Sequence, residues 1–151
     1  MLRLHASAFA YRGAGCLVVG ASGSGKSRLL AEALLHGAEM IADDQVQLRA
    51  EGGTLFAAAP PALAGVLELR GLGLIRIPAE TTRAEHPLHL QLTLSVGVPE
   101  RLPEPQHTTH LGIAIPTLTL AAPLHPPSLL LYLDALREGR ILPTDWAPFS
   151  P

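Results

Sequence analysis

The chain has 151 residues, of which 48% are hydrophobic and 16% are charged, so it has enough apolar side chain for a core and is not a disordered polymer. This length predicts a single domain over residues 1–151. Eleven basic and thirteen acidic side chains give a formal net charge of −2, which offers no positive surface for nucleic acid.

The sequence also argues against secretion and against a membrane partner. The longest apolar tract, residues 111–124, is interrupted by Pro116 and Pro123 and is shorter than the roughly 20 residues that span a bilayer. The single cysteine, Cys16, cannot form an internal disulfide, and the N-terminal residues lack an unbroken apolar segment. We therefore expect a cytoplasmic protein.

The first half of the chain is predicted to alternate strands with one helix. Period-two alternation and short apolar runs indicate the strands, and apolar residues three and four apart indicate the helix. In chain order we expect a strand over 2–8 with one solvent-facing side, a buried strand over 16–19, a helix from about Lys26 to Gly37, a buried strand over 40–42 and a hairpin of 46–49 with 54–56.

The second half is predicted to contain further strands and a final helix. In chain order we expect a strand near 67–70 that enters a tight loop, an amphipathic strand over 88–94 with a polar outer face, a loop over 99–105, strands over 111–115 and 117–120, a helix over 128–138 and an irregular tail over 143–151. The whole pattern predicts an α/β fold with more strand than helix.

A glycine-rich loop gives the clearest functional signal. Between a buried strand and a helix lies the run Gly20-Ala21-Ser22-Gly23-Ser24-Gly25-Lys26-Ser27, which satisfies G-x-x-x-x-G-K-[ST]. In such loops the backbone N–H groups and the helix N-terminus bind phosphates, the lysine reaches the β- and γ-phosphates, and the hydroxyl can ligate magnesium. Lys26 is the only lysine in the chain. The loop predicts binding of a nucleoside triphosphate, either ATP or GTP.

Two pairs of polar residues are candidates for the chemistry beside this loop. Asp43 and Asp44 end a buried strand, where side chains reach the ligand crevice of an α/β sheet. One can hold magnesium while the other accepts a proton from an attacking hydroxyl; the alternative is a solvated turn. Glu68 and Arg70 share one face of a strand before a glycine-rich loop, and form either part of the site or a surface ion pair.

Histidines and a loop arginine are weaker candidates. His5 lies on the polar side of the first strand, and Arg101 could stabilise charge on a transferred phosphoryl group if it is more than a loop residue. Two histidine pairs have i,i+3 spacing, but neither has a cysteine or carboxylate companion at zinc-like spacing. We predict exposed histidines rather than metal ligands at positions 86, 89, 107 and 110.

Together these motifs resemble the catalytic domain of the HPr kinase/phosphorylase family, bacterial enzymes that phosphorylate a serine of the phosphocarrier protein HPr. The matching segments are His5-Ala6-Ser7, GASGSGKS at 20–27, HGAEMIADDQVQL at 36–48, LAGVLELRGLGLIRI at 63–77 and Glu100-Arg101-Leu102. The resemblance implies a P-loop fold like that of phosphoenolpyruvate carboxykinase, in the short form of alphaproteobacteria, and a homo-oligomer, typically a hexamer.

The resemblance also implies roles for individual residues. These are Lys26 and His5 as catalytic residues near the phosphates, Ser27 and Glu68 as magnesium ligands, Asp44 as the base that accepts the serine proton, and Arg101 as the active-site arginine. The family's arginine-containing loop for dephosphorylation should fall near residues 123–128, which contain no arginine. The kinase reaction is therefore expected rather than its phosphorylase counterpart.

The leading hypothesis from the sequence is an ATP- and Mg²⁺-dependent serine kinase that acts on HPr or an HPr-like carrier. A second hypothesis is a kinase of the same fold that acts on another peptide or on a metabolite hydroxyl. A third is a non-catalytic module that senses ATP and recruits a partner. Retention of Asp44, Glu68 and Lys26 together argues against the third, because a sensor needs no base.

Overall fold

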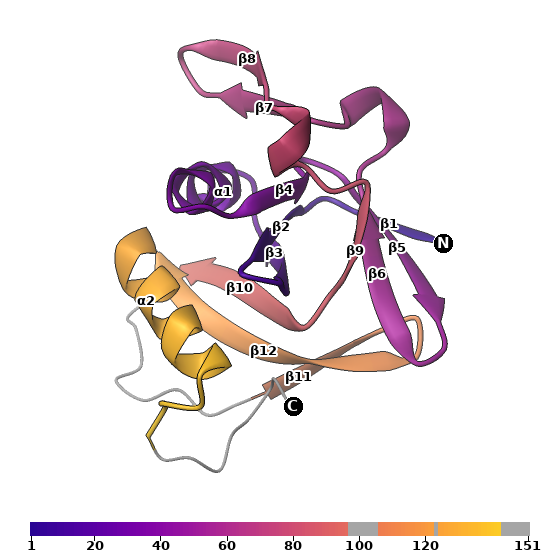
Figure 1. Ribbon diagram of the computed structural model, residues 1–151, viewed down its shortest axis with the longest axis vertical. Helices are drawn as coiled ribbons and strands as arrows, with labels where there is room; N and C mark the ends of the chain where they lie inside the picture. Colours follow the sequence, from indigo (N-terminus) through magenta and orange to yellow (C-terminus); the bar gives the residue numbers. More distant parts are fainter. Residues whose placement is uncertain (97–105, 123, 143–151) are drawn as a thin grey trace.

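The computed structural model describes residues 1–96, 106–122 and 124–142, and shows a strand-rich α/β fold (Figure 1). The α-helices in the described residues are α1 (Lys26–Leu35) and α2 (Pro126–Arg137), and two single-turn 3-10 helices are η1 (Pro61–Leu63) and η2 (Ala79–Thr81). The strands are β1 (Leu2–Leu4), β2 (Ser7–Tyr11), β3 (Ala14–Gly20), β4 (Glu39–Ala42), β5 (Val46–Glu51), β6 (Thr54–Ala58), β7 (Val66–Leu69), β8 (Gly73–Arg76), β9 (Glu85–Pro87), β10 (Leu90–Val96), β11 (Gln106–His110) and β12 (Ile113–Ala122).

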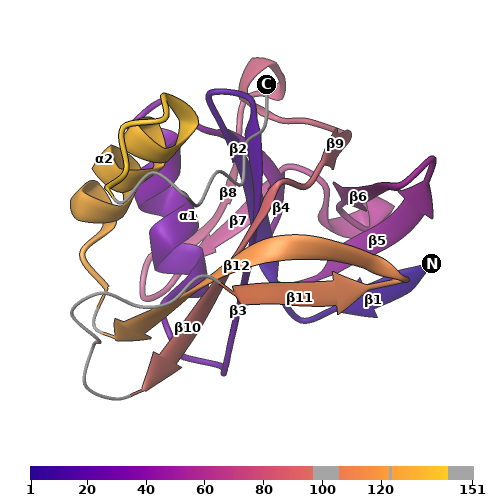
Figure 2. The same cartoon turned by 90° about the horizontal axis from the view of Figure 1, so that it is seen from below.

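A central six-stranded sheet has the order β11-β12-β10-β3-β2-β4. Its neighbours β12, β10 and β3 are parallel, whereas β2 is antiparallel to both β3 and β4. A four-stranded sheet, β1-β5-β6-β9, and a two-stranded sheet, β7-β8, complete the fold. Figure 2 shows α1 and α2 on one side of the central sheet and the β5-β6 hairpin on the other.

Two apolar clusters form the core, one on each face of the central sheet. On the helix side, Leu30 of α1 and Leu133 of α2 pack with sheet residues that include Phe9. On the opposite side, alternate residues such as Leu17 pack against Leu48 of the four-stranded sheet. Because successive strand residues point to opposite faces, a strand between these layers is apolar at nearly every position.

The prediction of one half-exposed strand over residues 2–8 was wrong. The chain changes sheet at His5 and Ala6: β1 pairs with β5, whereas β2 enters the central sheet and is buried at every position. The predicted alternation holds for residues 2–5, where Arg3 and His5 are exposed, but it fails from Ala6 on, where every residue is buried. Small residues such as Ala8 and Ala10 instead fit between two packed layers.

The polar outer face predicted for residues 88–94 was also wrong. β10 lies between β3 and β12, so Gln91 is only 5% exposed, and its amide donates to the Thr93 hydroxyl at 3.0 Å. The Gln91 carbonyl lies 2.7 Å from Nε2 of His110, which is partly buried rather than exposed. His89 is partly buried too, and its Nδ1 accepts a hydrogen bond from the Gly15 backbone N–H at 2.9 Å.

The C-terminal strands differ from the prediction in one further respect. Residues 111–115 and 117–120 do not form two strands, because β12 continues through Pro116, and β11 was not predicted. Pairing of β12 with β10 begins at Thr117, so Pro116 lies outside the stretch that is hydrogen-bonded on both sides. This position tolerates the missing N–H of proline.

Other predictions are confirmed. The helix after the glycine-rich loop is α1, the hairpin is β5-β6, β7 leads into a glycine-rich turn, and the last described helix, α2, begins two residues earlier than predicted. The segment over 99–105 and the tail over 143–151 lie outside the described residues. No helix in the described part of the chain is long and apolar enough to cross a membrane.

We expect Gly15→Ala to lower the free energy of unfolding by about 3 kcal/mol, as overpacking does at rigid sites. A Cβ at this position would lie 1.9 Å from the backbone oxygen of Pro87, which cannot move away as a flexible side chain could. Urea unfolding of the two proteins measures the difference. Gly112→Ala is the control, because that turn has a positive φ but open space, and strain alone costs about 1 kcal/mol. Equal losses would show that the contact with Pro87 is not the cause.

Candidate active site

The topology brings three chain segments to one edge of the central sheet. Since β2 is antiparallel to both β3 and β4, the start of β2 lies beside the ends of its two neighbours. The end of β3 leads into the glycine-rich loop, and the end of β4 leads into Asp43 and Asp44. The start of β2 brings Ser7, and His5 shortly before it, to the same edge.

Glycine is required at several positions of the loop over 20–27. Gly23 and Gly25 have φ values of 80° and 105°, and a Cβ on Gly20 would lie 2.6 Å from the Ser24 hydroxyl and 2.9 Å from the Leu94 backbone oxygen. Gly25 is the N-cap of α1, and no side chain caps that end of the helix. The first N–H groups of α1 therefore remain available to an anion.

The ammonium group of Lys26 lies within this loop. It donates to the backbone oxygens of Gly20 at 2.7 Å and Ala21 at 3.0 Å, and the residue is only 7% exposed. Burial lowers the pKa of Lys26, and the nearby carboxylates of Asp43 and Asp44 partly oppose that shift. The only lysine of the chain is thus held against the loop that its sequence motif predicts.

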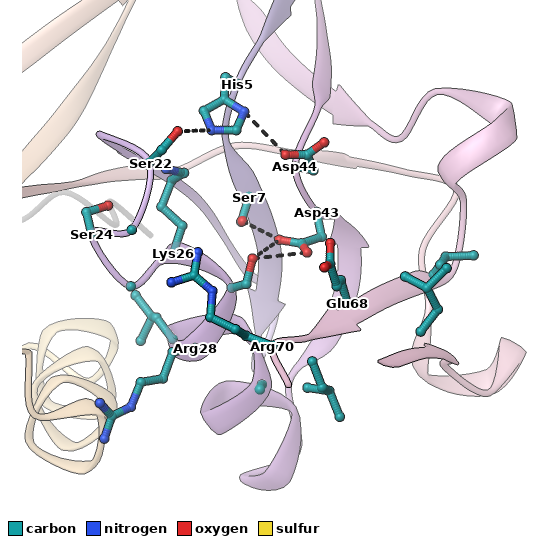
Figure 3. Close-up of a pocket in the computed structure, with 18 of the residues that line it drawn as sticks. His5, Ser7, Ser22, Ser24, Lys26, Arg28, Asp43, Asp44, Glu68 and Arg70 are labelled. Atoms are coloured by element: carbon teal, nitrogen blue, oxygen red, sulfur yellow. Dashed lines mark hydrogen bonds and ion pairs between the residues drawn. The ribbon is translucent and has the colours of Figure 1, made fainter. Parts of the chain in front are cut away.

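Asp43 joins the sheet to the loop. This carboxylate is buried and accepts a hydrogen bond from the Ser7 hydroxyl at 2.6 Å. It also accepts from the Ser27 hydroxyl, at 2.9 Å to Oδ1 and 3.1 Å to Oδ2. The two residues predicted from separate motifs, Ser27 and Asp43, are therefore in direct contact. Figure 3 shows Asp43 with Ser7 beside it.

Asp44 points in a different direction from Asp43. Its side chain is 65% exposed, and its Oδ1 lies 3.4 Å from Nδ1 of His5, whose Nε2 lies 3.5 Å from the Ser22 hydroxyl. The backbone of Asp44 has a φ of +66°, a conformation that few residues other than glycine adopt. This backbone conformation separates the directions of two adjacent carboxylates, one towards Ser27 and one towards His5.

Glu68 and Arg70 lie across the pocket from the loop. A pocket of about 960 Å³ is lined by residues 22–27 of the glycine-rich loop, His5, both aspartates, Glu68 and Arg70. Within the described residues no ion pair joins Glu68 to Arg70, so the alternative of a surface ion pair is not found. Figure 3 shows the Arg70 side chain extending towards the loop.

The structure thus brings together all but one of the residues selected from the sequence. The exception is Arg101, which lies outside the described residues. Two further residues were not given roles: Arg28 lines the pocket, and Ser7 contacts Asp43. Ser7 belongs to the matching segment His5-Ala6-Ser7, but no role was assigned to it, since a lone serine in a strand is usually structural. No cluster of three metal-binding His, Cys, Asp or Glu side chains occurs in the part of the chain that is described.

The fold and the site define a strand-rich α/β domain in which a glycine-rich loop that ends in Lys26 and Ser27 faces paired aspartates. Comparison with known proteins then shows the family. Residues 1–122 match the HPr Serine kinase C-terminal domain family, and the chain belongs to this family.

Two relatives illustrate the similarity. The HPr kinase/phosphorylase of Clostridium novyi is 31% identical over 136 residues, which cover 82% of this chain and 43% of that protein. The HPr kinase/phosphorylase of Clostridium tetani is 39% identical over 77 residues, covering 51% of this chain and 25% of that protein. The chain thus spans less than half the length of these two relatives.

The fold has a counterpart among solved structures. The structure of the Hpr(Ser) kinase/phosphatase from Coxiella burnetii matches with a TM-score of 0.82 and 23% identity, covering 91% of this chain and 97% of that chain. This likeness confirms the fold class expected from the sequence.

Because Asp44 has a positive φ, we expect the stability of the protein to depend on which residue occupies position 44. Asp44→Ala should lower the free energy of unfolding by about 1 kcal/mol, because a Cβ without a polar side chain disfavours the left-handed region. Asp44→Asn should stay within about 0.5 kcal/mol of the parent, since asparagine tolerates that region. Urea unfolding measures both. If Asn and Ala lose the same amount, the exposed pairing with His5 and not the backbone sets the cost.

Proposed function

We propose that this chain is an ATP- and Mg²⁺-dependent serine kinase that phosphorylates HPr or an HPr-like carrier protein. The observation that carries the proposal is that two adjacent carboxylates in one pocket differ in their burial and in their contacts. Asp43 is buried against the hydroxyl of the phosphate loop, whereas Asp44 is exposed at the same pocket. In this proposal Asp43 orients Ser27 beside the bound phosphates, and the exposed Asp44 receives the incoming hydroxyl.

The loop supports binding of the donor nucleotide. Backbone N–H groups at the start of α1 and the ammonium of Lys26 are the positive groups that a polyphosphate needs. Lys26 would exchange its two bonds to loop carbonyls for bonds to phosphate oxygens. Its partial burial strengthens such a charge-assisted bond, because less water competes for the ammonium.

The residues present fit a magnesium ion. The Ser27 hydroxyl, Asp43 and Glu68 offer oxygen atoms in the same pocket, and oxygen is the ligand that Mg²⁺ prefers. Magnesium usually takes only one or two carboxylates and completes its coordination with water and phosphate oxygens, so the two carboxylates of Asp43 and Glu68 are enough. The ion would neutralise charge on the phosphates; Ser27, Asp43 and Glu68 would hold it.

Asp44 is proposed as the base. In the transfer, a serine oxygen of the carrier forms a bond to the terminal phosphorus, the bond from that phosphorus to the bridging oxygen breaks, and ADP leaves. The serine proton passes to the Asp44 carboxylate. His5 lies 3.4 Å from that carboxylate and can hold it in place.

The acceptor is proposed from the family and from its named relatives, which are HPr kinase/phosphorylases. We test it by incubating the protein with ATP, Mg²⁺ and purified HPr, and measuring intact mass followed by peptide mapping. The expected product is HPr with one phosphate on a serine. Failure to modify HPr while another acceptor is modified would favour a kinase for a different substrate. Nucleotide binding without transfer to any acceptor would favour a sensor module.

We expect Asp44→Asn to reduce the rate of phosphoryl transfer by about 10³-fold, within the range that a general base contributes. Binding of ATP should stay near that of the parent, because Lys26 and the loop are unchanged. Initial rates of transfer and equilibrium binding of a fluorescent ATP analogue measure the two effects separately.

Asp134→Asn is the matched control for this substitution. Asp134 is an aspartate of α2 that pairs with Arg12, and it does not line the pocket. Its variant should transfer phosphate at the parent rate. If Asp44→Asn also transferred phosphate at that rate, Asp44 would not be the base.

A further inference from the structure

We propose that Ser7 is a positioning residue of the magnesium site: its hydroxyl fixes the Asp43 carboxylate, which in turn directs the Ser27 hydroxyl towards the metal. The inference rests on the proposed function, because it concerns the same pocket. It assigns a role to a residue of the sheet that does not itself need to touch metal or nucleotide.

The first argument is the position of Ser7 in the fold. It is the first residue of β2 and is fully buried, between β3 on one side and β4 on the other. Ser7 pairs with Val18 of β3, and the next residue pairs with Ala42, directly before Asp43. A side chain on this part of the sheet moves little, so its hydroxyl is a fixed reference point for Asp43.

The second argument is that the site pairs the Ser7 hydroxyl with a charged group. A buried hydroxyl without a partner destabilises a fold, and buried alanines at positions 8 and 10 show that this strand also accommodates a side chain without one. The Ser7 hydroxyl donates to Asp43 Oδ1 at 2.6 Å, the shorter of the two serine contacts to that oxygen. A hydrogen bond to a charged acceptor is stronger than one between neutral groups.

The third argument concerns the direction of the Ser27 hydroxyl. A serine hydroxyl has one proton and two lone pairs, and Ser27 directs its proton to Asp43. Its lone pairs then face away from the carboxylate and are available to a cation. This orientation depends on the rotation of the Asp43 carboxylate, which Ser7 fixes through Oδ1. Loss of Ser7 leaves Ser27 as the only side-chain donor to Asp43 among the contacts of the described residues.

The test is a magnesium titration of nucleotide binding, which does not require phosphoryl transfer. Binding of a fluorescent, non-hydrolysable ATP analogue is measured at increasing Mg²⁺ for the parent and for Ser7→Ala. We expect Ser7→Ala to raise the Mg²⁺ concentration at half-saturation by about tenfold, as loss of a hydrogen bond to a charged group predicts. Binding of the analogue without Mg²⁺ should not change. Ser7→Thr, which keeps the hydroxyl, should restore the parent titration.

A double-mutant cycle separates positioning from a general structural effect. In the Asp43→Asn background, Ser7→Ala should change the half-saturating Mg²⁺ concentration by less than about twofold, because residues that act through each other are not additive. The matched control is Thr117→Val, which removes another buried hydroxyl of the same sheet, bonded to Thr108. This control should titrate like the parent.

The outcomes are distinguishable. An unchanged magnesium titration in Ser7→Ala, or an equal effect in the Asp43→Asn background, overturns the role of Ser7. Thermal unfolding shows whether Ser7→Ala is folded. If it is not, Ser7→Cys replaces it, and its weaker thiol donor should shift the magnesium titration in the same direction. If the parent binds nucleotide and Mg²⁺ but phosphorylates no carrier, the proposed function fails while Ser7 keeps its role. If the parent binds neither, both are overturned.

Discussion

The hydrogen bonds of Asp43 connect the elements that make up the site. Through Ser27 this carboxylate is tied to the start of α1, and through Ser7 to the start of β2, while its own backbone continues from β4. A buried carboxylate without such donors would destabilise the fold, so its two serine partners and its burial depend on one another. The relative positions of loop, helix and sheet edge are consequently set by a few short bonds.

The antiparallel β2 strand is the topological reason for this arrangement. In a sheet of only parallel strands, the crevice receives strand ends alone. Here β2 runs in the opposite direction between β3 and β4, so its first residues reach the same edge. His5 and Ser7 therefore lie beside Asp44 and Asp43, although almost forty residues separate them in the sequence.

Local patterns predicted much of the fold and of the site. The glycine-rich loop, α1 and the β5-β6 hairpin depend on local backbone requirements, and the sequence predicted each of them. The errors occurred where burial comes from distant elements: β2 is covered by two layers, and Gln91 is enclosed because β10 is central in the sheet. The contact of Ser7 with Asp43 was not predictable for the same reason, because it requires the order of strands.

The β7-β8 pair differs from the rest of the site in how it is attached. It is a separate two-stranded sheet that projects from the body of the molecule in Figure 1, and β8 is exposed along its whole length. It nevertheless presents Glu68 and Arg70 to the pocket. β7 is anchored in the core by Leu67, but β8 has little buried surface and can open locally at a lower free energy than the central sheet. The two sides of the pocket therefore differ in local stability: buried strands hold the loop and the aspartates, whereas the side that carries Glu68 and Arg70 includes an exposed strand.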